Sequence, residues 1–170
     1  MPDAALSSSP VTLRAYRATD LPALLDIAVA AWGPIYALYL DLLGPELFAI
    51  VYTDWQTEKR RQIESACQGE HGAKVIVAER DGQPIGFVSY YINHETGVGE
   101  IGNNAVAPQH QGEGVGQRLY EQALAAMRQE GMRCASVDTG LDAAHAPARR
   151  AYEKAGFQRG LPGITYFRKL

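Results

Sequence analysis

Three glycines at alternate positions mark the stretch whose residue types most clearly suggest chemistry. Gly112, Gly114 and Gly116 follow an apolar strand pattern that runs to Val106, and a long helical pattern begins directly after them. Glycine lets backbone amides point inward at angles that other residues avoid, and it lets a ligand approach closely. The first N–H groups of a helix lack internal partners, and the helix dipole favours negative charge there. The stretch therefore predicts a cradle for a phosphate or pyrophosphate group.

Composition narrows the classes of protein to consider. The chain has 170 residues, of which 46% are apolar and 21% charged, as in an average soluble domain. The formal charge of −3 argues against general nucleic-acid binding, which needs a basic face. Cys67 and Cys134 lie far apart without CxxC spacing, so both are expected to be reduced core thiols. The histidines have no ligand spacing, and no metal is expected.

The N-terminal region lacks the features of a secretion signal, since it has neither a basic start nor an apolar centre. Residues 1–10 are expected to be a disordered tail before a single domain over residues 11–170. The most apolar run, residues 35–52, is interrupted by Asp41, Gly44 and Pro45, so it is not expected to span a bilayer. A cytoplasmic protein is the default expectation.

The periodicity of the chain predicts the elements that must position the glycine stretch. Alternating apolar residues indicate strands, and a turn at Asp81 and Gly82 joins two of them in an antiparallel meander. The expected strands are residues 11–17, 73–79, 84–92, 100–106, 133–138, 157–159 and 164–169. The expected helices are residues 21–32, 45–68, 115–130 and 146–154. The fold class is α/β, with a mixed, mostly antiparallel sheet of six to seven strands and helices on both faces. The strand after the third helix is expected to run parallel to its neighbour through a right-handed crossover.

Two runs of the chain, Gln111-Gly112-Glu113-Gly114-Val115-Gly116 and HAPARRAYEKAGF from His145 to Phe157, form a pair of motifs. They resemble the signatures of the GCN5-related N-acetyltransferase (GNAT) family. The first is similar to the family's Gln/Arg-x-x-Gly-x-Gly/Ala signature, and the second is similar to Asn-x-x-Ala followed by Tyr and Gly-Phe. A helix and a strand of the family's length separate the two motifs, and the element order fits the GNAT fold from residue 11 to 170.

The resemblance implies acetyl-coenzyme A (acetyl-CoA) as the donor. Its pyrophosphate would bind the backbone amides of the six residues of the first motif. Its pantetheine arm would pair with the backbone near Ala105 and Val106, where that strand splays from the strand carrying Val137 and leaves polar groups unpaired. His145 replaces the usual Asn and is expected either to contact the cofactor or to cap a helix. Glu113 stands where the family often has Lys or Arg, so it should repel the ligand unless it points to solvent.

The resemblance also implies a base and an acid. Because an alkylamine has a pKa of about 10, it must lose a proton before or during attack on the thioester. Glu100 matches the catalytic glutamate of the histone-acetylating members, although it could also be a solvated charge at a strand end. Residues 100, 102, 104 and 106 share one face of a regular strand, so Glu100 should point toward the donor contacts unless a bulge intervenes. Tyr152 aligns with the family's general acid, which protonates the leaving thiolate; the alternative is a tyrosine of the helix core.

The predicted function is transfer of an acetyl group from acetyl-CoA to a primary amine by direct attack in a ternary complex. The acceptor would be a small-molecule amine or a protein amino group. The alternative is an inactive acyl-CoA sensor or partner-binding module on the same fold. Dinucleotide binding is disfavoured because the spacing is GxGxG and not GxGxxG. Dimerisation through the last strands would follow family habit, and neither nucleic acid nor membrane is expected as a partner.

Overall fold

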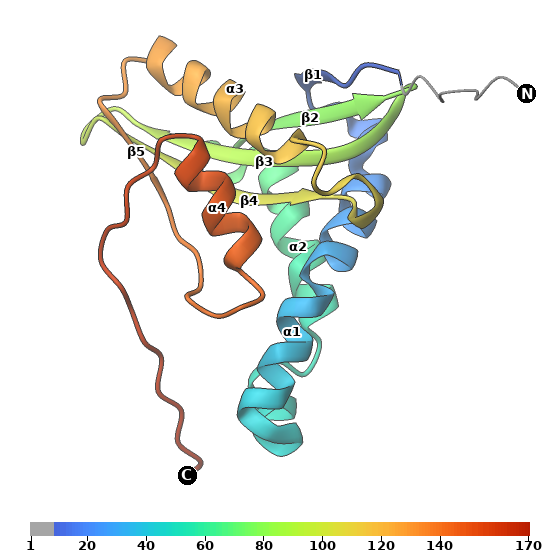
Figure 1. Cartoon of the computed structure of the whole chain (residues 1–170), viewed down its shortest axis with the longest axis vertical. Helices are drawn as coiled ribbons and strands as arrows, with labels where there is room; N and C mark the ends of the chain where they lie inside the picture. The colour runs from blue at the N-terminus through green and yellow to red at the C-terminus, as the bar shows by residue number, and fades with distance from the viewer. Residues whose placement is uncertain (1–8) are drawn as a thin grey trace, which may run out of the picture.

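The computed structural model describes residues 9–170, so most of the expected N-terminal tail lies outside the described residues. The chain forms one sheet with helices on both of its faces (Figure 1). In chain order its elements are β1 (Thr12–Ala15), η1 (Ala18–Asp20), α1 (Leu21–Val51), α2 (Trp55–Cys67), η2 (Glu70–Gly72), β2 (Lys74–Arg80), β3 (Gln83–Asn93), β4 (Val98–Val106), η3 (Pro108–His110), α3 (Val115–Gln129), β5 (Cys134–Val137) and α4 (Ala146–Lys154).

The sheet has the strand order β1-β2-β3-β4-β5. The first three pairings are antiparallel and the last, between β4 and β5, is parallel. Asp81 and Gly82 both have positive φ angles, of 53° and 77°, and form the tight turn between β2 and β3. Helix α3 connects β4 to β5 as the crossover that a parallel pair requires. The mixed, mostly antiparallel sheet predicted from the sequence is therefore confirmed.

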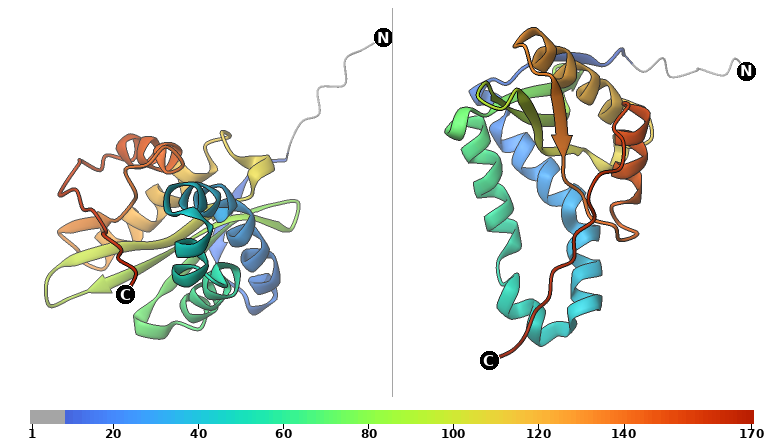
Figure 2. Two further views of the ribbon diagram at one scale, coloured as in Figure 1. Left: turned by 90° about the horizontal axis from the view of Figure 1, so that it is seen from below. Right: turned by 90° about the vertical axis from the view of Figure 1, so that its left-hand side faces the viewer.

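Helices α3 and α4 cover one face of the sheet and helices α1 and α2 cover the other (Figure 2). Each face has its own apolar core beneath its helices. The first core includes Val88, Ile101, Leu119 and Tyr152. The second includes Leu24, Ile63, Phe87 and Ala105. The core to which a β4 residue belongs therefore shows which face of the sheet its side chain occupies.

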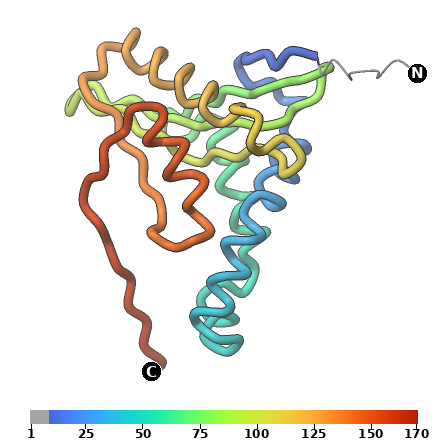
Figure 3. Tube along the Cα trace, viewed as in Figure 1, coloured from blue at the N-terminus to red at the C-terminus, as the bar shows by residue number. Residues whose placement is uncertain are grey.

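The prediction of six to seven strands is wrong, because the described residues form five. Neither residues 157–159 nor residues 164–169 pair with a strand. The segment after α4 leaves the sheet as an extended chain and reaches the far end of α1, where Lys169 pairs with Glu46 (Figures 1 and 3). Its alternating apolar pattern is typical of a strand, but a strand forms only where an edge is available to pair with it.

Strand β5 is consequently a short strand at one edge of the sheet. Its residues alternate between exposed and half-buried, and the thiol of Cys134 is exposed. The expectation of two core thiols is therefore wrong for Cys134. It fits Cys67 better, since that thiol is half-buried and burial raises its pKa to about 11.

Helix α1 is longer than the sequence analysis predicts. It continues through Pro34 and breaks only at Gly44, whose φ and ψ are 73° and 160°. Proline costs a helix one hydrogen bond, but contacts with other elements can outweigh that loss, and Tyr36 stacks on Trp55 of the next helix, two residues after Pro34. The second helical segment is likewise divided, because α2 begins only at Trp55. By length and composition alone, the stretch Ala18–Val51 could cross a membrane; core helices of soluble proteins pass the same test, and Leu24 and Ala28 here are buried against the sheet.

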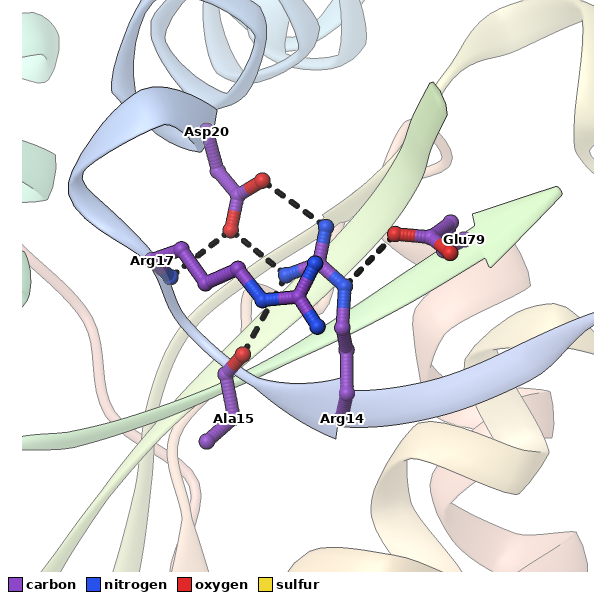
Figure 4. A network of polar contacts seen from close by, with 5 residues as sticks. All are labelled: Arg14, Ala15, Arg17, Asp20 and Glu79. Carbon is purple, nitrogen blue, oxygen red and sulfur yellow. Dashed lines mark hydrogen bonds and ion pairs between the residues drawn. The ribbon is translucent and has the colours of Figure 1, made fainter. Parts of the chain in front are cut away.

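A buried ion pair fixes the start of α1 to the sheet. The guanidinium of Arg14 on β1 donates to both carboxylate oxygens of Asp20, at 2.7 and 2.8 Å, and to Glu79 on β2 at 2.6 Å (Figure 4). The hydrogen bonds from Arg14 lower the pKa of Asp20 against the opposing effect of burial. Since Asp20 also accepts from the backbone of Arg17, the pair orients the helices that cover one face of the site.

Candidate active site

The parallel strands β4 and β5 separate at the middle of β4. They pair only from Val98 with Cys134 to Ile101 with Val137. Strand β4 then continues for five more residues, to Val106, while β5 ends. From Gly102 onward the backbone of β4 has no strand on that side, so its polar groups are available to a ligand. The geometry matches the splayed pair that the resemblance implies, and the end of the pairing, at Ile101 and Val137, is called the divergence point.

A bulge in β4 shifts the alternation of its side chains, so that residues after the bulge face the opposite side of the sheet from the one that a regular strand would give them. Ile101 lies opposite Tyr90 and Ala105 lies opposite Phe87, so four steps along β4 match three along β3. Ile101 belongs to the core under α3 and α4, whereas Ala105 belongs to the core under α1 and α2. The expectation that Glu100 shares a face with residues 104 and 106 is therefore wrong: Glu100 faces the α1–α2 side.

Tyr152 lies on the opposite side, in a hydrogen-bonded cluster of three side chains. Asn104 donates from Nδ2 to the Tyr152 hydroxyl at 3.1 Å, and its Oδ1 accepts from the Tyr120 hydroxyl at 2.8 Å. Because the Asn104 oxygen already accepts from Tyr120, the Tyr152 hydroxyl donates to that oxygen only weakly, at 3.5 Å. Burial raises the pKa of Tyr152, which keeps the hydroxyl protonated. Sequence analysis missed Tyr120, since its place on an apolar helix stripe looks like core packing.

An open pocket of about 420 Å³ lies at the divergence point on the α1–α2 side of the sheet. It is lined by His71, Tyr91, Glu100, Ile101, Gly102, Asn103 and Asp138. Glu100 and Asp138 give it two carboxylates, which suit a cationic amine. The sequence analysis singled out Glu100 for this side of the reaction, but nothing in the sequence identified Asp138.

The glycine stretch forms an exposed loop between β4 and α3. Gly112 and Gly114 have φ angles of 82° and 79°, a region that favours glycine, and Gly114 is the N-cap of α3. No side chain among the described residues caps this helix. Gln111 donates its side-chain amide to the carbonyl of Val106 at 3.0 Å, which ties the loop to the end of β4. Gly116 lies inside the helix, where an added Cβ would make only ordinary van der Waals contact with Val106, at 3.8 Å. The N–H groups of this helix start suit an anion.

The carboxylate of Glu113 is held by a neighbouring strand. Arg80 at the end of β2 donates to it at 2.7 Å, and this hydrogen bond lowers the pKa of Glu113. His110 lies 3.4 Å from the other carboxylate oxygen. The negative charge of Glu113 beside the loop is thus compensated, mainly by Arg80, which is distant in the sequence.

The side chain of His145 does not cap α4, although the residue occupies the N-cap position. Its Nδ1 lies 2.7 Å from Asp142, and its backbone N–H donates to the same carboxylate. Arg149 donates to the carbonyls of Gly140 and Asp142, and so closes the loop that precedes the helix. A contact between His145 and the cofactor stays a prediction.

Comparison with known proteins identifies the family. The model of the acetyltransferase (GNAT) family matches residues 35–157, which is most of the chain. The chain belongs to the GNAT acetyltransferase family. A relative described as an uncharacterized N-acetyltransferase, from Archaeoglobus fulgidus, is 34% identical over 90 residues, and the match spans 60% of its length.

Solved GNAT structures share the fold. A GNAT acetyltransferase from Desulfovibrio desulfuricans has a TM-score of 0.63 and 23% identity, with 89% of this chain and 87% of that one covered. A GNAT acetyltransferase from Brucella melitensis, in complex with acetyl-CoA, has a TM-score of 0.59 and 24% identity over 88% and 84% of the two chains. At these identities the likeness concerns the fold, and the acetyltransferase character of this chain follows from its family.

Proposed function

We propose that this protein transfers the acetyl group of acetyl-CoA to a primary amine by direct attack in a ternary complex. The pyrophosphate would bind the backbone amides of residues 111–116, and the pantetheine arm would pair with β4 near Ala105 and Val106. The amine nitrogen would attack the thioester carbon while Glu100 accepts a proton through water. A backbone N–H near Val106 would stabilise the oxyanion. The C–S bond then breaks, and the thiolate takes the proton of Tyr152.

The observation that carries this proposal is the position of the two groups on opposite faces of the divergence point. The carboxylates of Glu100 and Asp138 line the pocket on one face. The protonated hydroxyl of Tyr152 lies on the other, oriented by Asn104. An amine entering from the first face and a thiol leaving on the second would each meet the group that its proton transfer requires.

A coupled assay of thiol release tests the function against the sensor alternative. Purified protein is incubated with acetyl-CoA and a panel of primary amines, and free thiol is followed through many turnovers. An enzyme releases thiol in proportion to an added acceptor. A sensor would be stabilised against heat by acetyl-CoA yet release thiol only at the rate of slow hydrolysis, whatever amine is present.

Replacing Glu113 with glutamine is expected to tighten acetyl-CoA binding by about two- to fivefold, the range of a single exposed charge. The substitution removes a negative charge beside the loop and releases the guanidinium of Arg80 toward it. Isothermal titration calorimetry of both proteins measures the effect. Glu121→Gln, an exposed carboxylate farther along α3, is the control and should change nothing. Weaker binding by the Glu113 variant would contradict the proposed pyrophosphate site.

We also propose that the protein is a homodimer in which residues 164–169 of one copy pair with β5 of the other. The apolar side chains of this segment are unusually exposed, at 76% for Ile164 and 84% for Tyr166. Strand β5 is an unpaired edge, which folded proteins normally cover. In a dimer, residues 164–169 of each copy would be covered by the partner copy and would pair with its free β5 edge.

The expected result is a dimer for the full chain and a monomer for Tyr166→Pro, because proline removes a backbone donor from the added strand. Light scattering coupled to size-exclusion chromatography measures both masses. Gly160→Pro lies in the same segment outside the expected strand and should remain dimeric. A full chain that is monomeric at tens of micromolar would contradict the proposal.

A further inference from the structure

Lys59 is a buried cation beneath the pocket. It lies on α2, is only 7% exposed, and places its Nζ 4.1 Å from the centre of the Trp32 ring. The Nζ donates to the side-chain oxygens of Gln62 at 2.8 Å and Asn103 at 3.2 Å. Buried lysines are rare unless they have a partner of opposite charge.

No carboxylate among the described residues forms an ion pair with Lys59, although the charge of the adjacent Glu58 acts to raise its pKa. The ion pairs between described residues, with N–O distances up to 4.0 Å, do not include Lys59. The neighbouring Glu58 is hydrogen-bonded to Arg61 instead, at 2.8 and 2.9 Å. Burial lowers the pKa of Lys59 to about 8, so the side chain still carries its charge at neutral pH. The fold thus maintains a positive charge that its own residues leave unpaired.

Lys59 also determines how Asn103 faces the pocket. An ammonium group can only donate hydrogen bonds, so the oxygen of the Asn103 amide must point toward Lys59. The amide NH₂ is then left to face the pocket that Asn103 lines. A donor backed by a positive charge recognises an oxygen atom, and most strongly an anionic one.

We propose that the acetyl acceptor is an amino acid whose carboxylate binds the amide of Asn103 above Lys59. Its amine, on the carbon next to the carboxylate, would then lie in the same pocket, which the carboxylates of Glu100 and Asp138 also line. Glu100 would reach this amine through water, as the proposed mechanism requires. This inference rests on the proposed function and specifies its substrate class.

Matched acceptors test the inference. L-Leucine, L-leucinamide and isoamylamine differ in the group beside the amine, and the same three forms of phenylalanine give a second series. The amino acids should have the highest kcat/KM, and Lys59→Met should lower their kcat/KM about tenfold or more, the range of a charged hydrogen bond. The same variant should change kcat/KM of the decarboxylated amines less than twofold. Loss of a buried, unpaired charge should leave Tm unchanged or raise it.

Asn103→Asp gives an independent test, because it supplies Lys59 with a carboxylate of nearly the same shape. This variant should lose the preference for amino acids over their amides and decarboxylated amines, as Lys59→Met does. Thiol release with amines but without preference for a carboxylate in the wild-type protein would overturn the inference and leave the proposed function intact. Absence of thiol release with every amine would instead overturn the proposed function. A loss of activity on all acceptors alike would assign Lys59 a structural role and also overturn the inference.

Discussion

Replacing Tyr152 with phenylalanine is expected to lower kcat by about 100-fold or more, the usual contribution of a general acid, and to leave the Kd of acetyl-CoA nearly unchanged. Phenylalanine keeps the ring contacts with Tyr120 and Phe157, whose ring centroids lie 4.9 and 6.0 Å away. The substitution therefore removes the proton donor and little else. Collapse of the tetrahedral intermediate would then expel an unprotonated thiolate.

The hydrogen bonds around Tyr152 suit a hydroxyl group that donates its proton during the reaction. Its hydroxyl accepts a hydrogen bond from Asn104, which would stabilise the phenolate formed when the proton leaves. Tyr120 fixes the orientation of that amide by occupying its oxygen. Because burial raises the pKa of Tyr152, the hydroxyl should stay protonated throughout the neutral range, and the rate should not fall through its ionisation below about pH 10.

Steady-state kinetics of thiol release and calorimetry with CoA measure the two quantities separately. Tyr90→Phe is the matched control, since Tyr90 is a buried tyrosine of the same core that lines a separate pocket, with Leu13 and Ala126, and not the pocket of Glu100. The control should keep wild-type kcat. An equal loss of kcat and of cofactor affinity in Tyr152→Phe, or no loss of either, would reject its role as the acid.

The parts of the site that the sequence predicts are those encoded by neighbouring residues. The glycine loop combines a strand end, left-handed glycines and a helix start within about a dozen positions, so its local pattern predicts its conformation. Tyr152 is likewise placed by the helix that carries it, which begins and ends where the sequence predicts.

The remaining features depend on pairing between distant segments. A single inserted residue in β4 moves Glu100 to the opposite face, and no local pattern distinguishes a bulged strand from a regular one. The compensation of Glu113 by Arg80 and the burial of Lys59 beneath Asn103 join residues more than 30 positions apart. The last two predicted strands fail for the same reason, since an alternating pattern predicts a strand but not the edge that pairs with it.

The bulge changes the face that Glu100 occupies and leaves its proposed role as the base intact. On a regular strand Glu100 would face the side of Asn104 and of Tyr152, the proposed acid. The bulge instead places Glu100 in the pocket on the α1–α2 face, together with Asp138. In the proposed mechanism, a base and an acid on opposite faces would let one proton be removed from the amine and another be supplied to the thiolate without competition between the two groups.

Replacing Glu100 with glutamine is accordingly expected to lower kcat/KM for the amine at pH 7 by about 100-fold. Without a base the reaction depends on the free amine, whose fraction rises tenfold per pH unit up to its pKa of about 10. The deficit should therefore narrow as pH rises, and the pH–rate profile should shift toward alkaline values. Asp138→Asn tests the other carboxylate of the pocket, and Glu95→Gln in the exposed turn between β3 and β4 is the inert control. An unchanged profile for Glu100→Gln, or the alkaline shift in Asp138→Asn instead, would remove Glu100 as the base.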